Sequence, residues 1–135
     1  MRLLMVLAAV AAMASPAAAQ AWRPFEVRFA TNSHDLAPEE RARLDAVPRQ
    51  MRATGEAPRI IIAGHADGAE GSAAEAVSLS RRRADIVRDY LTALGVPASN
   101  MTTQAFGSTR PAIESTEPQS DNRRVEVTFG PGSGW

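Results

Sequence analysis

Residues 60–90 read IIIAGHADGAEGSAAEAVSLSRRRADIVRDY, a pattern that predicts a buried strand, a loop containing glycines and a long amphipathic helix. The three isoleucines at 60–62 form a continuous apolar run, which is typical of a strand that is covered on both faces. At about 100° per residue, the apolar side chains of the helix gather on one side of it. Ser72 and Glu75 have the spacing of a capping box, and Gly95 is placed to end the helix.

One arginine breaks the pattern of this helix. Arg83 projects from the middle of the apolar side, toward the N-terminal end, whereas Arg81 and Arg82 fall on the solvated side. A cation in that position must be paired, hydrogen-bonded or aimed at a ligand, because desolvating it alone is costly. Asp67, just past the end of the preceding strand, is the nearest candidate acid. The two residues could form a structural ion pair or a ligand site.

The rest of the chain predicts three more strands and a second helix. Pro38, followed by two glutamates, is a good helix start, and Gly55 a good helix end, while Pro48 should kink or split this helix. Strands are expected at residues 24–30, 59–63, 101–106 and 125–129. The order β-α-β-α-β-β predicts an α+β fold, an α/β sandwich with a mixed four-stranded sheet and two main helices. Strand–helix–strand units favour parallel neighbours, and the last strand is free to be antiparallel.

The first residues predict a secretory signal peptide, with Arg2 before an apolar run and an Ala-Ala-Ala cleavage site at 17–19. The signal peptide would comprise residues 1–19. Residues 20–130 then fit one domain with a single core, and residues 131–135 look like a flexible tail. We therefore expect export to the periplasm, with no transmembrane segment in the mature chain.

Composition gives little reason to expect nucleic acid as a partner. The chain has 15 basic and 15 acidic residues, and loss of Arg2 would leave one net negative charge. It contains no cysteine, so neither a disulfide nor a lipid-bearing cysteine is available in this sequence.

Signals for catalysis and for metal binding are weak. The sequence has no cysteine nucleophile, no G-x-S-x-G motif and no pair of acids arranged as in a glycosidase. His34, Asp35, His65 and Asp67 lack a metal-binding spacing, and His65 is expected to be a packed, hydrogen-bonded residue. We expect no enzymatic activity, no catalytic residue, no metal and no cofactor.

Short motifs spread over residues 29–127 carry a family resemblance. They are F-A-T-N-S-H-D-L at 29–36, G-H-A-D at 64–67, L-S-R-R-R-A-D-I-V at 79–87, A-F-G at 105–107 and N-R-R-V-E at 122–126. In this order and spacing the chain resembles the OmpA-like C-terminal domain family, a peptidoglycan-binding module of Gram-negative cell envelopes.

The resemblance implies a ligand and a set of site residues. The family binds the peptide stem of peptidoglycan, chiefly its meso-diaminopimelate, and its paired acid and arginine match Asp67 and Arg83. Arg83 would hold the ligand carboxylate with a bidentate fork, and Asp67 would accept from the ammonium. The family also uses residues that match Asn32 and Arg123. Asn32 could instead brace its own loop, and Arg123 could be an ordinary strand flank.

Three departures from the family pattern bear on this interpretation. Ala66 replaces a threonine, the loop from Asp67 to Leu79 is one residue longer, and Ala76 stands where the family has a pocket-framing asparagine. Two hypotheses follow. The chain is a peptidoglycan-binding module, or it is a periplasmic protein-interaction or scaffold domain whose peptidoglycan binding is weakened or lost. In either case an envelope protein is a possible partner, and association with the cell wall or outer membrane is expected.

Overall fold

The computed structural model describes residues 22–130. The predicted signal peptide at 1–19 and the predicted tail at 131–135 lie outside the described residues. The elements are β1 (Phe25–Arg28), α2 (Pro38–Thr54), β2 (Arg59–Gly64), α3 (Ala73–Ala93), β3 (Met101–Ala105) and β4 (Arg124–Gly130). This order confirms the predicted sequence of strands and helices.

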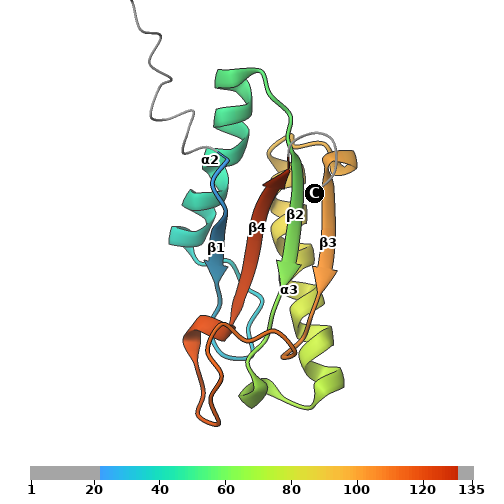
Figure 1. The fold of residues 1–135 in the computed structure, drawn as a ribbon. Coiled ribbons are helices and arrows are strands. Elements are labelled where there is room, and N and C mark those ends of the chain that lie inside the picture. Colours follow the sequence, from blue (N-terminus) through green and yellow to red (C-terminus); the bar gives the residue numbers. More distant parts are fainter. Residues whose placement is uncertain (1–21, 131–135) are drawn as a thin grey trace, which may run out of the picture.

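The four strands form one mixed sheet in the order β1-β4-β2-β3 (Figure 1). Strands β2 and β3 are parallel neighbours joined through α3, as expected for a strand–helix–strand unit. The last strand, β4, lies between β1 and β2 and is antiparallel to both. The α+β fold with a mixed four-stranded sheet is therefore confirmed.

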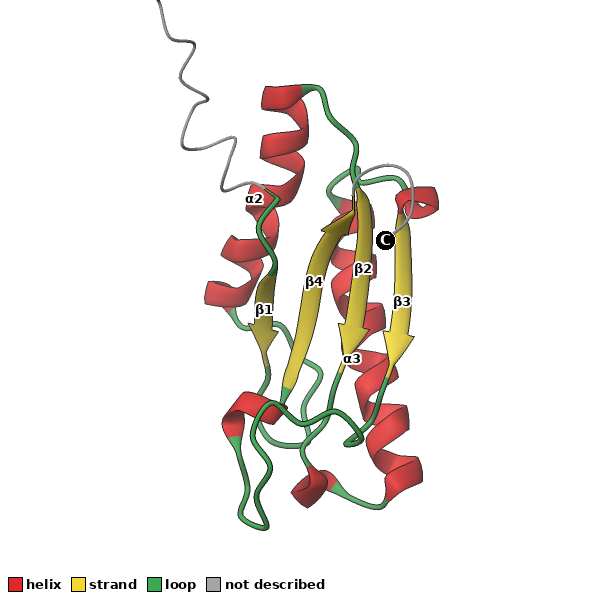
Figure 2. Ribbon diagram, in the orientation of Figure 1, coloured by secondary structure: helices red, strands yellow, loops and turns green. Residues whose placement is uncertain are grey.

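Both helices pack on the same side of the sheet, and the core lies between the two layers (Figure 2). The prediction that β2 is covered on both faces is wrong, because Ile61 points to the other face and is only half-buried. The isoleucine run reflects instead the interior position of β2 in the sheet, between β3 and β4. The main buried core residues are Val27, Leu44, Val47, Ile60, Ile62, Ala84, Val87, Leu91, Val125 and Val127.

Helix α2 begins at Pro38 and is closed by Gly55 with φ 70°, as predicted. The expected split at Pro48 does not occur, and α2 runs through it as one helix. A proline inside a helix removes one backbone hydrogen bond. Pro48 is buried beside Leu44 and Val47, so its ring adds to the apolar face that packs on the core and offsets that loss.

Helix α3 is capped as the sequence indicates. Ser72 Oγ accepts a hydrogen bond from the backbone N–H of Glu75 at 3.2 Å, and Gly95 follows the helix with φ 98°. These two signals place the helix so that its central part lies over β2, where Gly64 meets Ser80.

The contact between Gly64 and α3 is very close. A Cβ built on Gly64 would lie 1.9 Å from the carbonyl oxygen of Ser80, which belongs to the helix backbone and cannot rotate away. We expect Gly64→Ala to lower the free energy of unfolding by at least about 2 kcal/mol, because helix and strand must separate.

Gly68→Ala is the matched control, since a Cβ there meets no atom within 4 Å. It should change stability by less than about 0.5 kcal/mol. Denaturant unfolding of both variants measures the difference, and equal effects would contradict the close packing.

Candidate functional site

Three segments far apart in the sequence meet beyond the carboxyl end of β2, at the lower end of the sheet in Figure 1. They are the loop after β1, which contains Asn32, the loop after β2, which contains Asp67, and the turn before β4, which ends at Arg123. Arg83 reaches the same place from α3. The structure thus brings together the four residues that the resemblance singled out.

Arg83 is fully buried, with 0% of its surface exposed, and each of its five N–H groups has an acceptor within reach. Nε donates to the carbonyl oxygen of Ser33 at 2.8 Å. Nη1 donates to the carbonyl of His65 at 3.1 Å and to Glu70 Oε1 at 2.8 Å. Nη2 donates to the carbonyl of Ala30 at 3.2 Å and to Glu70 Oε2 at 2.5 Å. A guanidinium has five such donors, so this one is saturated.

The acidic partner of Arg83 is therefore Glu70, so the structural ion pair between Arg83 and Asp67 that was left open above is not formed. The longer loop forms a 3-10 turn, Gly68–Glu70, which directs the Glu70 carboxylate inward. This carboxylate also accepts from the backbone N–H groups of Asp67 at 2.8 Å and Asn32 at 2.7 Å. The location of Arg83 also differs from the prediction, since it lies in the middle of α3 and not near its N-terminal end.

Glu70 remains ionised although it is buried. Burial alone would raise the pKa of its carboxyl group, but the hydrogen bond from Arg83, the two backbone N–H groups and the Arg83 charge together hold the pKa below its ordinary value. The sequence does contain a signal for this residue. Asp67 and Glu70 form a capping box, and the D-x-x-E spacing of such a box is visible in the sequence.

Asp67 is buried near this pair but has its own partners. Its Oδ1 accepts from Asn122 Nδ2 at 2.9 Å, and its Oδ2 accepts from the backbone N–H of Ala69 at 3.1 Å. Burial would raise the pKa of Asp67, but hydrogen bonds from Asn122, Ala69 and Gln119 and the nearby charge of Arg123 hold it below its ordinary value. Sequence analysis missed Asn122, although it is the first residue of the N-R-R motif.

Asn32 and Arg123 both take part in the local loop structure. Asn32 adopts a left-handed backbone conformation with φ 54°, which asparagine tolerates better than most residues. Arg123 Nε donates to the carbonyl oxygen of Phe29 at 2.9 Å, which ties β4 to the loop after β1. Asn32 itself is exposed.

A cavity of 220 Å³ adjoins the Arg83–Glu70 pair. Ala76, at the position of the family's asparagine, is buried in a small apolar cluster with Ala66 and Leu79. The cavity is lined by Asn32, Glu70, Glu75, Ser78, Leu79 and Arg82.

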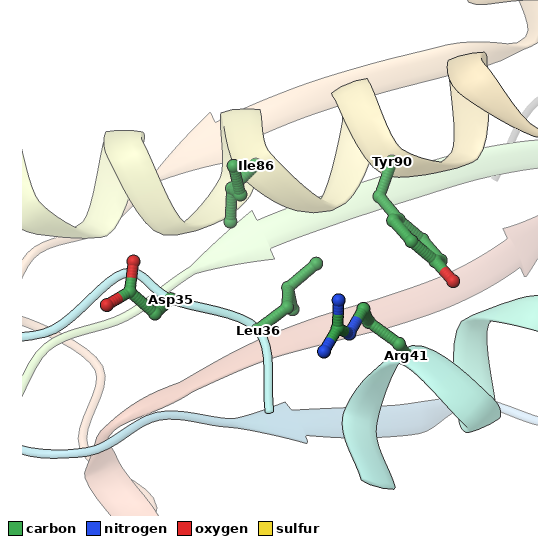
Figure 3. A pocket seen from close by; sticks show the side chains of 5 residues that line it. All are labelled: Asp35, Leu36, Arg41, Ile86 and Tyr90. Carbon is green, nitrogen blue, oxygen red and sulfur yellow. The ribbon is translucent and has the colours of Figure 1, made fainter. Parts of the chain in front are cut away.

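A second cavity, of 310 Å³, lies on the helix side between the loop after β1 and α3 (Figure 3). Leu36, Ile86 and the ring of Tyr90 form its apolar part, and Asp35 and Arg41 supply one charge of each sign. None of the four residues that the resemblance singled out lines it, so it is separate from the site around Arg83.

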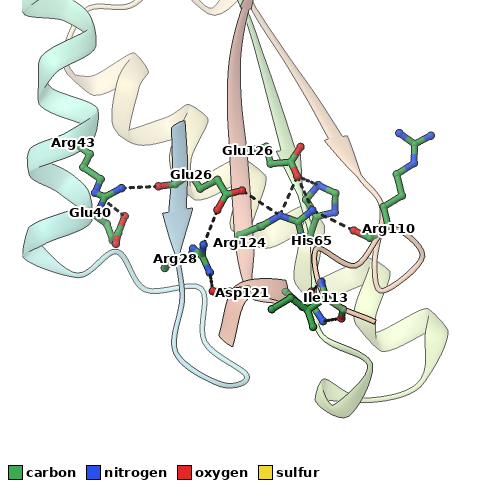
Figure 4. Close-up of polar contacts among 11 residues, drawn as sticks. Glu26, Arg28, Glu40, Arg43, His65, Arg110, Ile113, Asp121, Arg124 and Glu126 are labelled. Atoms are coloured by element: carbon green, nitrogen blue, oxygen red, sulfur yellow. Dashed lines mark hydrogen bonds and ion pairs between the residues drawn. The ribbon is translucent and has the colours of Figure 1, made fainter. Parts of the chain in front are cut away.

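The open face of the sheet has a charged cluster around His65 (Figure 4). The His65 ring is only 2% exposed and stacks on Phe106 with centroids 5.4 Å apart. Its packing was predicted, but neither ring nitrogen has a hydrogen-bond partner, and Nε2 lies 3.5 Å from Glu126 Oε1. Burial, with the charges of Arg124 and Arg110, lowers the pKa of His65 to about 4 despite Glu126.

Residues 22–130 contain no group of three or more His, Cys, Asp or Glu side chains that could hold a metal ion. In the same range, neither helix combines the length and the apolar character that crossing a membrane requires.

The fold and this arrangement of loops define a class of protein. The structure superimposes on the crystal structure of the peptidoglycan-associated lipoprotein from Burkholderia pseudomallei with a TM-score of 0.71. The sequence identity is 23%, and the match covers 78% of this chain and 89% of that one. The two proteins therefore share a fold.

Sequence comparison identifies the family. Residues 28–124 match the OmpA family, and the chain belongs to it. It is 33% identical over 101 residues to the peptidoglycan-associated lipoprotein of Pseudomonas aeruginosa, covering 73% of this chain and 58% of that protein. It is 34% identical over 103 residues to the peptidoglycan-binding protein ArfA of Mycobacterium tuberculosis, covering 75% and 31%. The chain thus spans less than two thirds of the length of these relatives.

The low pKa of His65 predicts a pH dependence of stability. The ordinary pKa is 6.5 and the folded pKa is about 4, so the neutral ring contributes its full stability above pH 6.5. As the pH falls below 6.5, the unfolded chain gains a proton that the folded chain does not. We expect the free energy of unfolding to fall by on the order of 2 kcal/mol between pH 7 and pH 5.

His65→Gln should flatten this profile. His34→Gln is the control, because His34 is the only other histidine and is exposed, and it should keep the wild-type profile. Denaturant unfolding at each pH measures both, and a wild-type profile in His65→Gln would contradict the assignment.

The buried pair predicts different roles for two adjacent arginines. Arg83→Ala leaves Glu70 buried without its partner and should cost about 3–5 kcal/mol of stability. Arg82→Ala removes an exposed side chain and should change stability by less than about 0.5 kcal/mol. Thermal and denaturant unfolding separate the two variants, and similar losses would show that the pair does not hold the site together.

Proposed function

We propose that this chain is a non-catalytic peptidoglycan-binding domain that acts in the periplasm or at the cell wall. Its ligand is the peptide stem, held at the meso-diaminopimelate through Asp67 and Arg83. Membership of the OmpA family supports this proposal, and so does the sequence similarity to the peptidoglycan-binding protein ArfA. The observation that carries the proposal is the convergence of Asp67, Arg83, Asn32 and Arg123 at one end of the sheet.

The chemistry of the two central residues suits the ligand. The diaminopimelate side chain ends in an ammonium and a carboxylate on one carbon. Asp67 stays ionised and accepts from the ammonium, and Arg83 is matched to the carboxylate. Its contact with Glu70, two nitrogens to two oxygens at 2.8 and 2.5 Å, has the bidentate geometry with which arginine binds a carboxylate. Asn32 and Arg123 flank this position and would contact the stem.

Two observations favour the alternative hypothesis. The donors of Arg83 are all engaged within the protein, and Ala76 contributes no polar group to the site. A domain of this fold with weakened peptidoglycan binding would instead act as a periplasmic scaffold or protein-interaction domain for an envelope protein. Binding to the stem peptide decides between the two functions.

The test is calorimetric titration of the purified protein with a muropeptide that contains meso-diaminopimelate. We expect saturable binding by the wild type. Asp67→Asn keeps the size of the side chain but removes its charge, and it should weaken binding by about 2 kcal/mol, roughly 30-fold.

Asp35→Asn is the matched control, because Asp35 is exposed and lines the separate cavity, and it should bind as the wild type does. Circular dichroism and melting temperature verify that each variant is folded. A folded wild type that does not bind the muropeptide would overturn the proposal in favour of the scaffold role.

A further inference from the structure

We propose that Glu70 competes with the ligand's carboxylate for Arg83, and so reduces the preference of this chain for stem peptides with a free diaminopimelate carboxylate. This inference rests on the proposed function and assigns a role to a residue that the family motifs do not include. It concerns the ligand class. Stems with a free carboxylate at the diaminopimelate centre must displace Glu70, whereas stems with an amidated end need not.

Every N–H group of Arg83 already has a hydrogen-bond acceptor within the protein. Two of its N–H groups bond to Glu70, and the other three bond to the carbonyl oxygens of Ser33, His65 and Ala30. The His65 carbonyl directly follows β2, and the carbonyls of Ala30 and Ser33 belong to the loop after β1. Glu70 is therefore the one acceptor that is itself a carboxylate and that a ligand carboxylate would replace.

Repulsion between the two carboxylates prevents both from binding beside Arg83. The side chains of Glu70 and Arg83 are 1% and 0% exposed. A second carboxylate beside Glu70 would place two like charges in a poorly solvated position, where only one of them can be paired with Arg83. The ligand carboxylate and Glu70 cannot both occupy the site in ionised form.

The cavity next to Arg83 gives the displaced Glu70 carboxylate a place to move to. Glu70 belongs to a three-residue 3-10 turn and lines the 220 Å³ cavity. Arg82, which directly precedes Arg83 in α3, lines the same cavity and is exposed. It offers a second cation for whichever carboxylate does not hold Arg83.

A difference in ligand preference follows. In the wild type, the gain from placing a ligand carboxylate on Arg83 is reduced by the loss of the Glu70 contact. The wild type should therefore discriminate weakly between stems that end in a carboxylate and stems that end in an amide, and Asp67 with the ammonium should dominate recognition.

The experiment compares two muropeptides that differ only in amidation of the diaminopimelate carboxyl, titrated into the wild type, Glu70→Ala and Glu75→Ala. Glu75 lines the same cavity but makes no hydrogen bond or ion pair with Arg83, so Glu75→Ala is the matched control. The wild type and Glu75→Ala should bind both stems with similar affinity. Glu70→Ala should prefer the free carboxylate by about tenfold or more, and an unchanged ratio would overturn the inference.

A second measurement does not depend on peptidoglycan. Acetate should raise the melting temperature of Glu70→Ala in a saturable manner, because it replaces the missing carboxylate, while chloride at equal ionic strength should not. The wild type should show no such rise. If Glu70→Ala folds only when acetate is present, the inference is supported.

The two measurements separate the inference from the proposed function. Absence of stem binding together with rescue by acetate would refute the proposed function, and with it the preference among stems, while showing that Arg83 accepts an added carboxylate where Glu70 is absent. The inference is overturned if a folded Glu70→Ala gains no stability from acetate. It is also overturned if Glu70→Ala stays unfolded at every acetate concentration and Glu70→Gln binds the two stems with the wild-type ratio of affinities.

Discussion

The buried ion pair between Arg83 and Glu70 is the interaction on which the loop end of this domain depends. One guanidinium joins α3 to the loop after β1, to the end of β2 and to the 3-10 turn. Burial of two charges is expensive, and it is tolerated here because every donor of the arginine is hydrogen-bonded. The position of each loop at this end is thus defined relative to a single side chain.

The two faces of the sheet differ in the side chains that they carry, and this difference determines where polar groups are accessible. The face toward the helices is apolar and closed. The opposite face carries alternating acidic and basic side chains from β1 and β4, and Arg124 contacts both Glu26 and Glu126. The candidate site lies on neither face but beyond the carboxyl end of β2, where loops follow the strands and hydrogen bonds hold the polar side chains.

Much of this structure could be predicted from the sequence. Caps, apolar periodicity and the positions of prolines and glycines predicted the elements, and the position of Arg83 on the apolar side of its helix predicted the centre of the candidate site. The partner of Arg83 could not be predicted by its distance along the chain, because the turn after Asp67 decides which acid faces inward. Likewise, the apolar run at 60–62 could not show whether its strand is covered on both faces or is an interior strand of a sheet that helices cover on a single face.

The place of β4 has a consequence for how the domain assembles. β4 is the last of the four strands along the chain, yet it lies between β1 and β2. A chain that emerges N-terminus first can pair β2 with β3 around α3, but β1 has no neighbour until residues 124–130 follow. Contacts of such high sequence separation slow folding. Closure of the sheet is therefore a late event in biogenesis, and an emerging chain that lacks β4 exposes strand edges which the finished domain conceals.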